Sequence, residues 1–341
     1  MKAMQLNRIV DLSENHKPLT SVQLPEPKII DGEVLIKVTA CGVCHTELDE
    51  IEGRTPPPSF PVIPGHQVVG YIVGTAPGES AYKINDRVGV GWIYSACGKC
   101  AYCLQGLENL CPEFKATGRD ENGGYAEYMK ADAKFIYRIP DFYSDAEASP
   151  LFCAGAIGYR SLHLSQLKNG QFLGLTGFGA SAHLVLKLVR FSLPEVNVFV
   201  FARSENERSF ARELGAVWTG DIGEKAPEQM HAIIDTTPVW KPVVDSLKNL
   251  RPNGRLVINA IRKEDYDKDY LQQLSYHEHL WMEKEIKSVA NVTKDDISEF
   301  LKLAAEAGIR PEISKFPLGE ANTALMEVRN SKIRGAKVLV M

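Results

Sequence analysis

The chain has 341 residues, of which 24% are charged and 44% are hydrophobic, and its formal net charge is -4. At roughly 150 residues per domain, this length predicts two domains of a globular protein. No basic tract stands out, which argues against nucleic acid as the main partner. Residues 1–8 lack the apolar core of a signal peptide, and no apolar run approaches the roughly 18 residues that span a bilayer. We therefore expect a cytoplasmic protein that does not associate with membranes.

The first clear element is a strand over residues 32–38, within a β-rich N-terminal segment. Cys41 and Cys44 follow with Cys-x-x-Cys spacing, which suits either a disulfide redox couple or half of a zinc site. His66 and Cys153 favour zinc, because together with Cys44 they form the three-ligand set of a catalytic zinc whose fourth position stays open. Cys41 is then expected to be a small buried residue.

Two residues beside Cys44 have side chains suited to such a site. The hydroxyl of Thr46 is close enough to hydrogen-bond a hydroxyl group at the open position and to pass its proton outward. Glu47 could accept the free ring N–H of His66 and so fix its tautomer. The alternatives are a threonine satisfied by backbone at a strand end and an ordinary surface glutamate.

The segments on either side of His66 are a loop and a strand that leads to a candidate pocket. The proline-rich run over residues 55–61 predicts a loop before His66. A strand is expected over residues 86–90, and Trp92 and Ile93 follow it. These two side chains could line a substrate pocket, but they could equally be part of a hydrophobic core.

A group of four cysteines comes next, at Cys97, Cys100, Cys103 and Cys111. Four thiolates can close a tetrahedral site that has no open position for chemistry, which predicts a structural zinc in a lobe over about residues 95–112. An iron–sulfur cluster also uses four thiolates and remains an alternative.

From about residue 171 the pattern changes to alternating strands and helices, which predicts a parallel doubly wound sheet. The expected strands are residues 172–176, 197–201, 231–235, 255–258 and 286–289, and the expected helices are residues 180–190 and 205–214. A further helix over 295–307 and a β-rich end over 336–341 close the chain. We expect this last segment to return to the first domain.

The first turn between strand and helix carries the dinucleotide fingerprint G-x-G-x-x-A. It comprises Gly177, Phe178, Gly179, Ala180, Ser181 and Ala182. The first glycine permits the tight turn, and the second lets the backbone approach the pyrophosphate of a nicotinamide coenzyme at the N-terminus of the helix. Glycines needed only for packing are the alternative.

The end of the second strand indicates which coenzyme the site prefers. An NAD site places an acid there to bind the ribose, whereas an NADP site supplies an arginine for the 2′-phosphate. Here the sequence is Ala202-Arg203-Ser204-Glu205, with the guanidinium before the acid. The pattern favours NADP(H), and the nearby Glu205 leaves NAD(H) open.

Taken together, these motifs resemble those of the zinc-dependent medium-chain alcohol dehydrogenases, including the cinnamyl and bacterial branches, along essentially the whole chain. The matching segments are residues 41–47, 65–70, 97–111, 123–128, 153–155 and 177–182. The resemblance implies a GroES-like β-rich catalytic domain over residues 1–153 and a Rossmann domain over 154–291. It also implies that residues 292–341 return to the catalytic domain and that the chain forms a homodimer or homotetramer.

The resemblance further implies two zinc ions per chain, one catalytic and one structural. The catalytic ligands would be Cys44, His66 and Cys153, and the structural ligands would be Cys97, Cys100, Cys103 and Cys111. We also expect His45 and Val289 to contact the coenzyme. The expected reaction is reversible hydride transfer between NADP(H) and a primary alcohol or aldehyde, of medium length or aromatic.

The chain departs from the family at four positions. Gln67 stands where the family usually has glutamate after the zinc histidine, and Asp49 stands where many members have a proton-relaying histidine. A carboxylate at Asp49 can still pass a proton. Near the coenzyme, Ile157 and Ala336 replace a threonine and an arginine that many relatives have.

Two other classes of protein remain possible from sequence. A metal-free quinone or enone reductase shares the glycine-rich turn but does not need the ligand set of Cys44, His66 and Cys153. A zinc or thiol sensor without enzymatic activity could use Cys41 and Cys44 as a redox pair. Neither alternative accounts for both the open ligand set and the nucleotide-binding turn.

Overall fold

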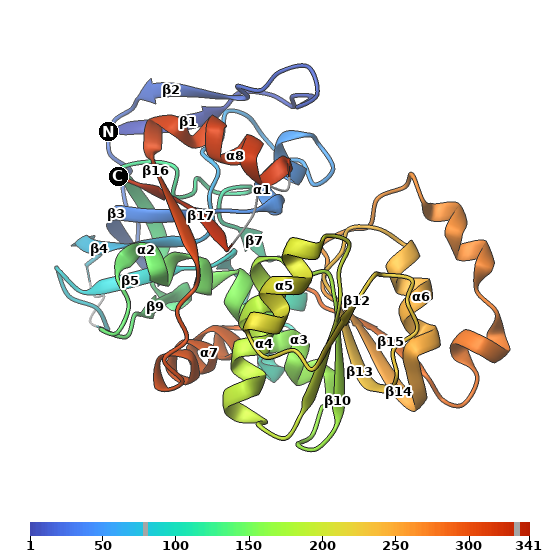
Figure 1. Ribbon diagram of the computed structural model, residues 1–341. Helices are drawn as coiled ribbons and strands as arrows, with labels where there is room; N and C mark the ends of the chain where they lie inside the picture. Colours follow the sequence, from blue (N-terminus) through green and yellow to red (C-terminus); the bar gives the residue numbers. More distant parts are fainter. Residues whose placement is uncertain (78–80, 331–334) are drawn as a thin grey trace. The chain divides into compact units, whose positions relative to one another are not determined.

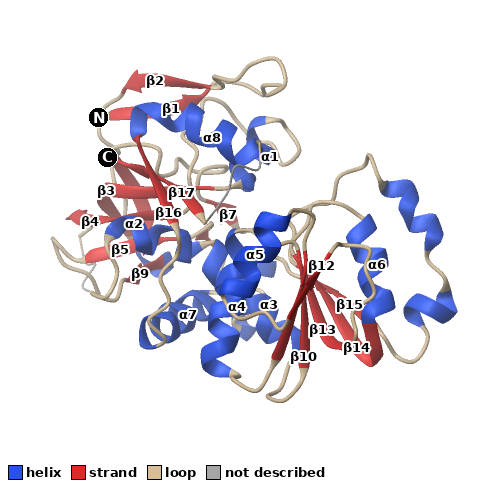
Figure 2. Cartoon of the chain, viewed as in Figure 1, coloured by secondary structure: helices blue, strands red, loops and turns tan. Residues whose placement is uncertain are grey.

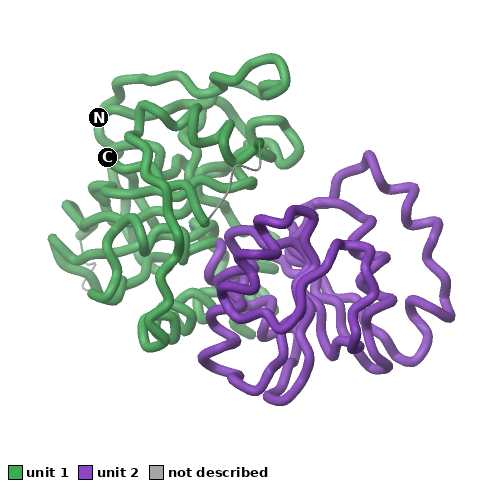
Figure 3. Tube along the Cα trace, in the orientation of Figure 1, with its two compact units in different colours: residues 1–153, 293–341 green, residues 154–292 purple. Residues whose placement is uncertain are grey.

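The structure is a computed structural model that describes residues 1–77, 81–330 and 335–341. The chain divides into two compact units, which Figure 3 distinguishes by colour. Unit 1 comprises Met1–Cys153 together with Thr293–Met341, and unit 2 comprises Ala154–Val292. Among the described residues, no helix is both long enough and apolar enough to pass through a bilayer.

Unit 1 is rich in short strands. Its strands are β1 (Lys2–Leu6), β2 (Leu19–Gln23), β3 (Glu33–Val43), β4 (Val68–Thr75), β5 (Arg87–Val90), β6 (Ile93–Ser95), β7 (Lys115–Ala116), β8 (Tyr128–Asp132), β9 (Ile136–Arg138), β16 (Ile313–Pro317) and β17 (Ala336–Val340). Its α-helices are α1 (His45–Ile51), α2 (Asp145–Ala148), α7 (Lys294–Glu306) and α8 (Ala321–Arg329). Short 3-10 turns include η1 (Cys103–Gln105), η2 (Glu108–Leu110), η3 (Ala133–Phe135), η4 (Ser149–Phe152) and η7 (Leu318–Glu320).

Strand β3 is the centre of the main sheet of unit 1. The described strands run in the order β16-β17-β3-β4-β5-β9, and β8 also pairs with β3. The C-terminal strand β17, drawn in red in Figure 1, lies antiparallel to the end of β3 and pairs Val340 with Ala40 and Lys337 with Val43. This pairing extends β3 to Val43, five residues beyond the predicted end at 38, because the partner strand comes from the far end of the chain.

Unit 2 alternates strands and helices. Its elements are α3 (Ala154–Ser165), β10 (Phe172–Thr176), α4 (Ala180–Ser192), β11 (Asn197–Phe201), α5 (Glu205–Glu213), β12 (Trp218–Gly220), β13 (Met230–Asp235), α6 (Lys241–Asn249), β14 (Leu250–Ile258) and β15 (Glu285–Ser288). A 3-10 helix, η5 (Lys268–Gln273), and a π-helical turn, η6 (Tyr276–Leu280), lie between β14 and β15.

The sheet of unit 2 is parallel throughout its described strands, in the order β12-β11-β10-β13-β14-β15. Figures 1 and 2 show helices α3, α4 and α5 on one face of this sheet and α6 on the other. The strand order reverses direction between β10 and β13, which is where doubly wound sheets bind ligands beyond the carboxyl ends of their strands. The predicted doubly wound sheet accompanied by a β-rich region is confirmed.

Candidate functional site

The three predicted ligands of a catalytic zinc come from separate segments of unit 1. Cys44 follows β3 and is the N-cap of α1, His66 lies in the loop before β4, and Cys153 follows the turn η4. The backbone before the His66 loop requires a glycine, because Gly65 has φ of 101° and a Cβ there would lie 2.4 Å from the Tyr125 ring. The loop can therefore pass directly over this buried ring.

One carbonyl group ties the three segments together. The backbone oxygen of Gln67 accepts the N–H of Gly42 at 2.9 Å, close to Cys44, and the hydroxyl of Ser149 at 2.7 Å, close to Cys153. Gln67 itself is buried, with 2% of its surface exposed. Its backbone thus holds the ligand segments in register, a role that does not depend on the side-chain change from glutamate to glutamine.

The ligand atoms are spaced as a zinc ion requires. Those of Cys44, His66 and Cys153 all lie within 4.8 Å of one another, and Cys44 Sγ is 3.6 Å from His66 Nε2. A tetrahedral zinc with its usual bond lengths would place a sulfur and a nitrogen ligand about 3.6 Å apart. The residues present therefore fit a three-coordinate protein site for zinc.

Glu47 organises two of these ligands at once. Its Oε1 atom is 2.6 Å from His66 Nδ1, and its Oε2 atom accepts the backbone N–H of Cys44 at 2.9 Å. The first contact fixes the His66 tautomer that leaves Nε2 free toward Cys44. The second is the N-terminal cap of α1, completed by the N–H of Thr46 donating to Cys44 Sγ at 3.4 Å.

Glu47 and His66, which are both buried, each stabilise the charged form of the other. Burial alone would raise the pKa of Glu47, but His66 and the backbone N–H of Cys44 hold that pKa below its usual value. Burial would likewise lower the pKa of His66, yet Glu47 and Cys44 raise it well above the usual range. Glu47 is thus an anion in the folded protein, and its charge faces the ring of His66.

The sequence did not single out Glu50, which lies one turn after Glu47 on α1 and is also buried, with 1% exposed. Burial, and then the repulsion of Glu47, raise the pKa of Glu50 to about 8. His66 opposes this rise, and so do the guanidinium of Arg119 and the indole of Trp92. The i, i+3 spacing of Glu47 and Glu50 could have revealed two acids on one helix face.

The other predicted residues of α1 differ in exposure. His45 is exposed and Thr46 is partly buried. Asp49 is buried, and its Oδ1 atom accepts Arg54 Nε at 2.7 Å. Asp49 therefore carries an ion pair in this structure, whatever part it takes in proton transfer.

Trp92 and Ile93 are buried together in a small hydrophobic cluster with Ala116 and Phe135. Trp92 also lies 5.1 Å from Phe114, centroid to centroid, and the Arg119 guanidinium stacks over its ring. These contacts place both residues in a small packed cluster, and their part in lining a substrate pocket stays a prediction.

The four cysteines of the predicted lobe lie together, with their sulfur atoms within 4.8 Å of one another. Cys97 Sγ is 3.9 Å from Cys103 Sγ, close to the separation of about 3.8 Å for two thiolates on a tetrahedral zinc. Backbone N–H groups, chiefly those of Lys99 and Cys100, lower the pKa of Cys97 to about 7, whereas burial raises that of Cys103 to about 12. The lobe is suited to a closed four-thiolate metal site.

The glycine-rich turn of unit 2 connects β10 to α4 as predicted. Gly177 has φ of 78°, and a Cβ there would lie 2.9 Å from Thr236 Oγ1, so only glycine fits. Around Gly179, by contrast, a Cβ would meet no described atom within 4 Å. This open face at the start of α4 is where a pyrophosphate could approach the backbone.

The remaining coenzyme candidates lie at the carboxyl ends of neighbouring strands. Phe178, Ala182, Ala202 and Val289 are buried, and Arg203 and Ser204 are exposed after β11. Ser181 accepts a hydrogen bond from Asn259, which follows β14, at 3.3 Å. The turn is thus linked to the opposite half of the sheet.

A buried ion pair that sequence analysis did not find lies at the carboxyl end of β13. Asp235 is fully buried, and Lys263 contacts its Oδ2 atom while donating to the carbonyl of Thr237 at 2.7 Å and that of Val239 at 3.2 Å. The pair fixes the loop after β13 beside the first glycine of the turn. No sequence pattern signals it, because the two residues are 28 positions apart.

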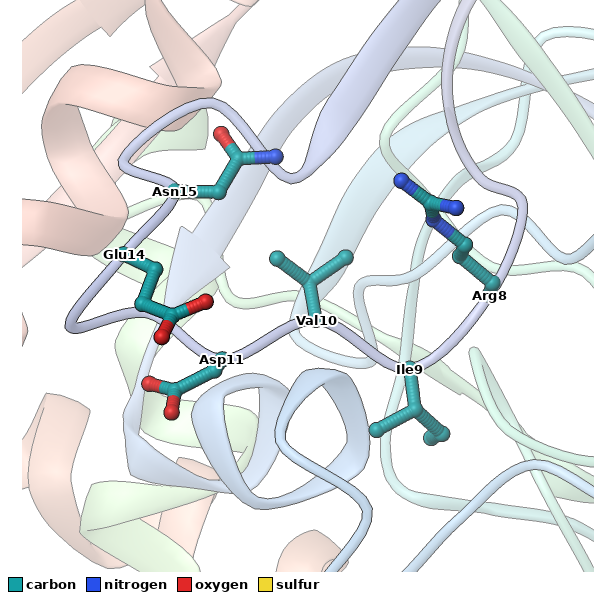
Figure 4. Close-up of a pocket in the computed structure, with 6 residues that line it drawn as sticks. All are labelled: Arg8, Ile9, Val10, Asp11, Glu14 and Asn15. Atoms are coloured by element: carbon teal, nitrogen blue, oxygen red, sulfur yellow. The ribbon is translucent and has the colours of Figure 1, made fainter.

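A small pocket of about 230 Å³ opens elsewhere on unit 1, in the loop between β1 and β2 (Figure 4). It is lined by Arg8, Ile9, Val10, Asp11, Glu14 and Asn15. None of the predicted site residues contributes to it.

Comparisons with known proteins show which family the chain belongs to. Residues 30–141 match the family described as the alcohol dehydrogenase GroES-like domain. "Probable alcohol dehydrogenase AdhA" of Mycobacterium tuberculosis is 40% identical over 329 residues, covering 95% of this chain and 93% of that protein. An alcohol dehydrogenase of Geobacillus stearothermophilus is 33% identical, and the match covers 96% of this chain and 97% of that protein. The solved structure of a cinnamyl alcohol dehydrogenase from Sorghum bicolor has a TM-score of 0.84 at 26% identity, covering 99% and 98% of the two chains.

The GroES-like match and the parallel nucleotide-binding type of sheet define the general class, the medium-chain dehydrogenases and reductases. Within that class, the similarity along nearly the whole length shows that the chain belongs to the zinc-dependent alcohol dehydrogenase family. The resemblance inferred from the motifs is therefore confirmed.

Proposed function

We propose that this chain is a zinc-dependent alcohol dehydrogenase or aldehyde reductase that uses NADP(H) in preference to NAD(H). The observation that carries the proposal is the grouping of Cys44, His66 and Cys153 with zinc-like spacing around a Glu47-oriented histidine. Its relatives named alcohol dehydrogenase match over almost their full length. The substrates would be primary alcohols and aldehydes, of medium length or aromatic.

In this proposal each unit has one task. The catalytic domain would comprise residues 1–153 and the returning segment 292–341, which is unit 1 with Val292 added, and the domain over 154–291 would bind the coenzyme through the Gly177–Ala182 turn. We further propose a homodimer or homotetramer with two zinc ions per chain. The second zinc would be held by the cysteine lobe and would stabilise a segment that has little regular structure of its own.

A zinc ion at the three-ligand site would polarise the substrate oxygen, and the nicotinamide would accept or donate the hydride. The protein itself supplies positioning and proton transfer. Glu47 would hold His66 in its ligand tautomer, and the hydroxyl of Thr46, two residues from Cys44, would exchange a proton with the substrate hydroxyl. Onward transfer to Asp49 would require its carboxylate to share the charge that now binds Arg54.

Initial rates of NADPH and NADH oxidation with an aromatic and an aliphatic aldehyde test the proposal. We expect turnover that favours NADPH, that a zinc chelator abolishes, and that Cys44→Ser removes without unfolding the chain. Cys41→Ser is the matched control, because the same atom is changed at a buried cysteine outside the ligand group. Activity of Cys44→Ser close to that of the unmodified protein would rule out the zinc mechanism, and a preference for NADH would overturn only the choice of coenzyme.

A further inference from the structure

The carboxyl end of β11 carries an arginine whose position is fixed by the backbone. Arg208, on α5, donates through Nη1 to the carbonyl of Ala202 at 2.7 Å and to that of Arg203 at 3.2 Å. Its guanidinium therefore lies at the strand end, where a doubly wound sheet reads the adenosine ribose of a dinucleotide. Only 21% of its side chain is exposed.

A second arginine lies beside it and connects to the neighbouring strand. Arg212 donates through Nη1 to the hydroxyl of Thr219 at 2.7 Å, and Thr219 lies on β12, the strand next to β11. Because Arg208 and Arg212 are four residues apart on α5, they share one face of the helix. Two guanidinium groups are thus held near the ends of adjacent strands.

Glu205 is the first acid after the strand end, where an acid could bind a ribose, and its carboxylate is already engaged. Its Oε2 atom accepts a hydrogen bond from Arg208 Nε at 3.0 Å, and its Oε1 atom accepts one from Arg212 Nη2. Both carboxylate oxygens therefore face guanidinium groups. The side chain of Glu205 is nevertheless 65% exposed, and exposed ion pairs of this kind are weakly held.

We propose that Arg208 binds the 2′-phosphate of NADP(H), and that Glu205 occupies this guanidinium in the free protein and is displaced by the phosphate. The inference rests on the proposed use of NADP(H) and names the residues that decide it. Arg203, which the sequence suggested, is exposed, and its backbone carbonyl is one of the two groups that hold Arg208.

The exchange is favourable on elementary grounds. A phosphate monoester carries close to two negative charges near neutral pH and offers three acceptor oxygens, so it binds a planar guanidinium more strongly than one carboxylate does. Glu205, at the first position of α5, can turn into solvent without disturbing the cap of that helix, which Ser204 and Glu207 provide. The negative charge of Glu205 would then repel the phosphate at short range. This repulsion weakens the preference for NADP(H) but does not prevent it.

Calorimetric binding of adenosine 2′,5′-bisphosphate and of 5′-AMP tests this without any turnover. Arg208→Gln should weaken binding of the bisphosphate by at least about tenfold, the usual loss for a hydrogen bond to a charged group, and leave 5′-AMP unchanged. Glu205→Gln should tighten binding of the bisphosphate by about two- to fivefold, because a weak surface competitor is removed. Lys248→Gln, an exposed change of the same charge on α6, is the control and should affect neither probe.

Each alternative result overturns the assignment. Equal weakening of both probes by Arg208→Gln would show that this arginine only supports the backbone of the strand end. Unchanged bisphosphate binding in Glu205→Gln, which alters an exposed side chain and should fold normally, would exclude the displacement. Tighter binding of 5′-AMP than of the bisphosphate by the unmodified protein would indicate an NAD site. Because no reaction is measured, these outcomes are independent of whether the proposed alcohol dehydrogenase activity is found.

Discussion

Replacing Glu50 by Gln should stabilise the protein increasingly as the pH rises from about 5 to about 8. In the folded protein the pKa of Glu50 is raised to about 8, whereas its ordinary value is 4.5. Between these values the folded protein keeps a proton that the unfolded chain releases, so the wild-type free energy of unfolding falls as the pH rises. Glutamine has the same shape and does not titrate.

The size of the effect follows from the shift of the pKa. At about 1.4 kcal/mol for each pKa unit, a rise from 4.5 to about 8 sets an upper bound of roughly 5 kcal/mol. A cation bound near His66 would reduce this bound, so we expect a difference of about 2–4 kcal/mol between Glu50→Gln and wild type at pH 8. Above pH 8 the difference should become constant.

Urea unfolding of both proteins at several pH values from 5 to 9 measures this difference. Taking the difference at each pH removes the contribution of the titrating groups that the two proteins share and that do not interact with Glu50. A difference that does not change with pH, or that shrinks as the pH rises, would refute the view that Glu50 is buried as a neutral acid.

Further predictions concern the two buried pairs. Glu47→Gln should lower zinc affinity by about 10- to 100-fold, since an amide cannot fix both Cys44 and the His66 tautomer. Competition with a chromophoric chelator measures the affinity, and the exposed Glu14→Gln is the control. Unchanged zinc affinity in Glu47→Gln would contradict this role of Glu47. Lys263→Met should lower the free energy of unfolding by about 3–5 kcal/mol, because it leaves the buried Asp235 without its cation. The double variant with Asp235→Asn should recover most of this loss in urea unfolding, and equal stability of the single and double variants would show that the pair is not coupled.

Much of the fold could be predicted because its signals are local. The turn at Gly177 lies between a buried strand and a helix, and β10, β11 and β13 have apolar sequences that can be read without their neighbours. The end of β3 could not be predicted in this way. Its last residues pair with β17, and the position of that strand depends on the whole fold of unit 1.

The grouping of Cys44, His66 and Cys153, and that of the four cysteines, could be predicted because cysteine and histidine at these spacings have few uses other than metal binding. The surroundings of the site could not, and α1 shows why. Its seven residues include three acids, a composition typical of an exposed helix, yet Glu47, Asp49 and Glu50 are all buried. Their partners, among them His66 and Arg119, come from other segments, so only the tertiary structure shows how the acids are accommodated.

The metal content of the purified protein tests the central claim most directly. We predict two zinc ions per chain in the unmodified protein, and one per chain in Cys44→Ser, which should retain the ion of the cysteine lobe and lose turnover with NADPH and aldehyde. Two zinc ions in Cys44→Ser with activity intact, or no zinc in an active unmodified protein, would contradict the assignment of Cys44, His66 and Cys153 to a catalytic metal site.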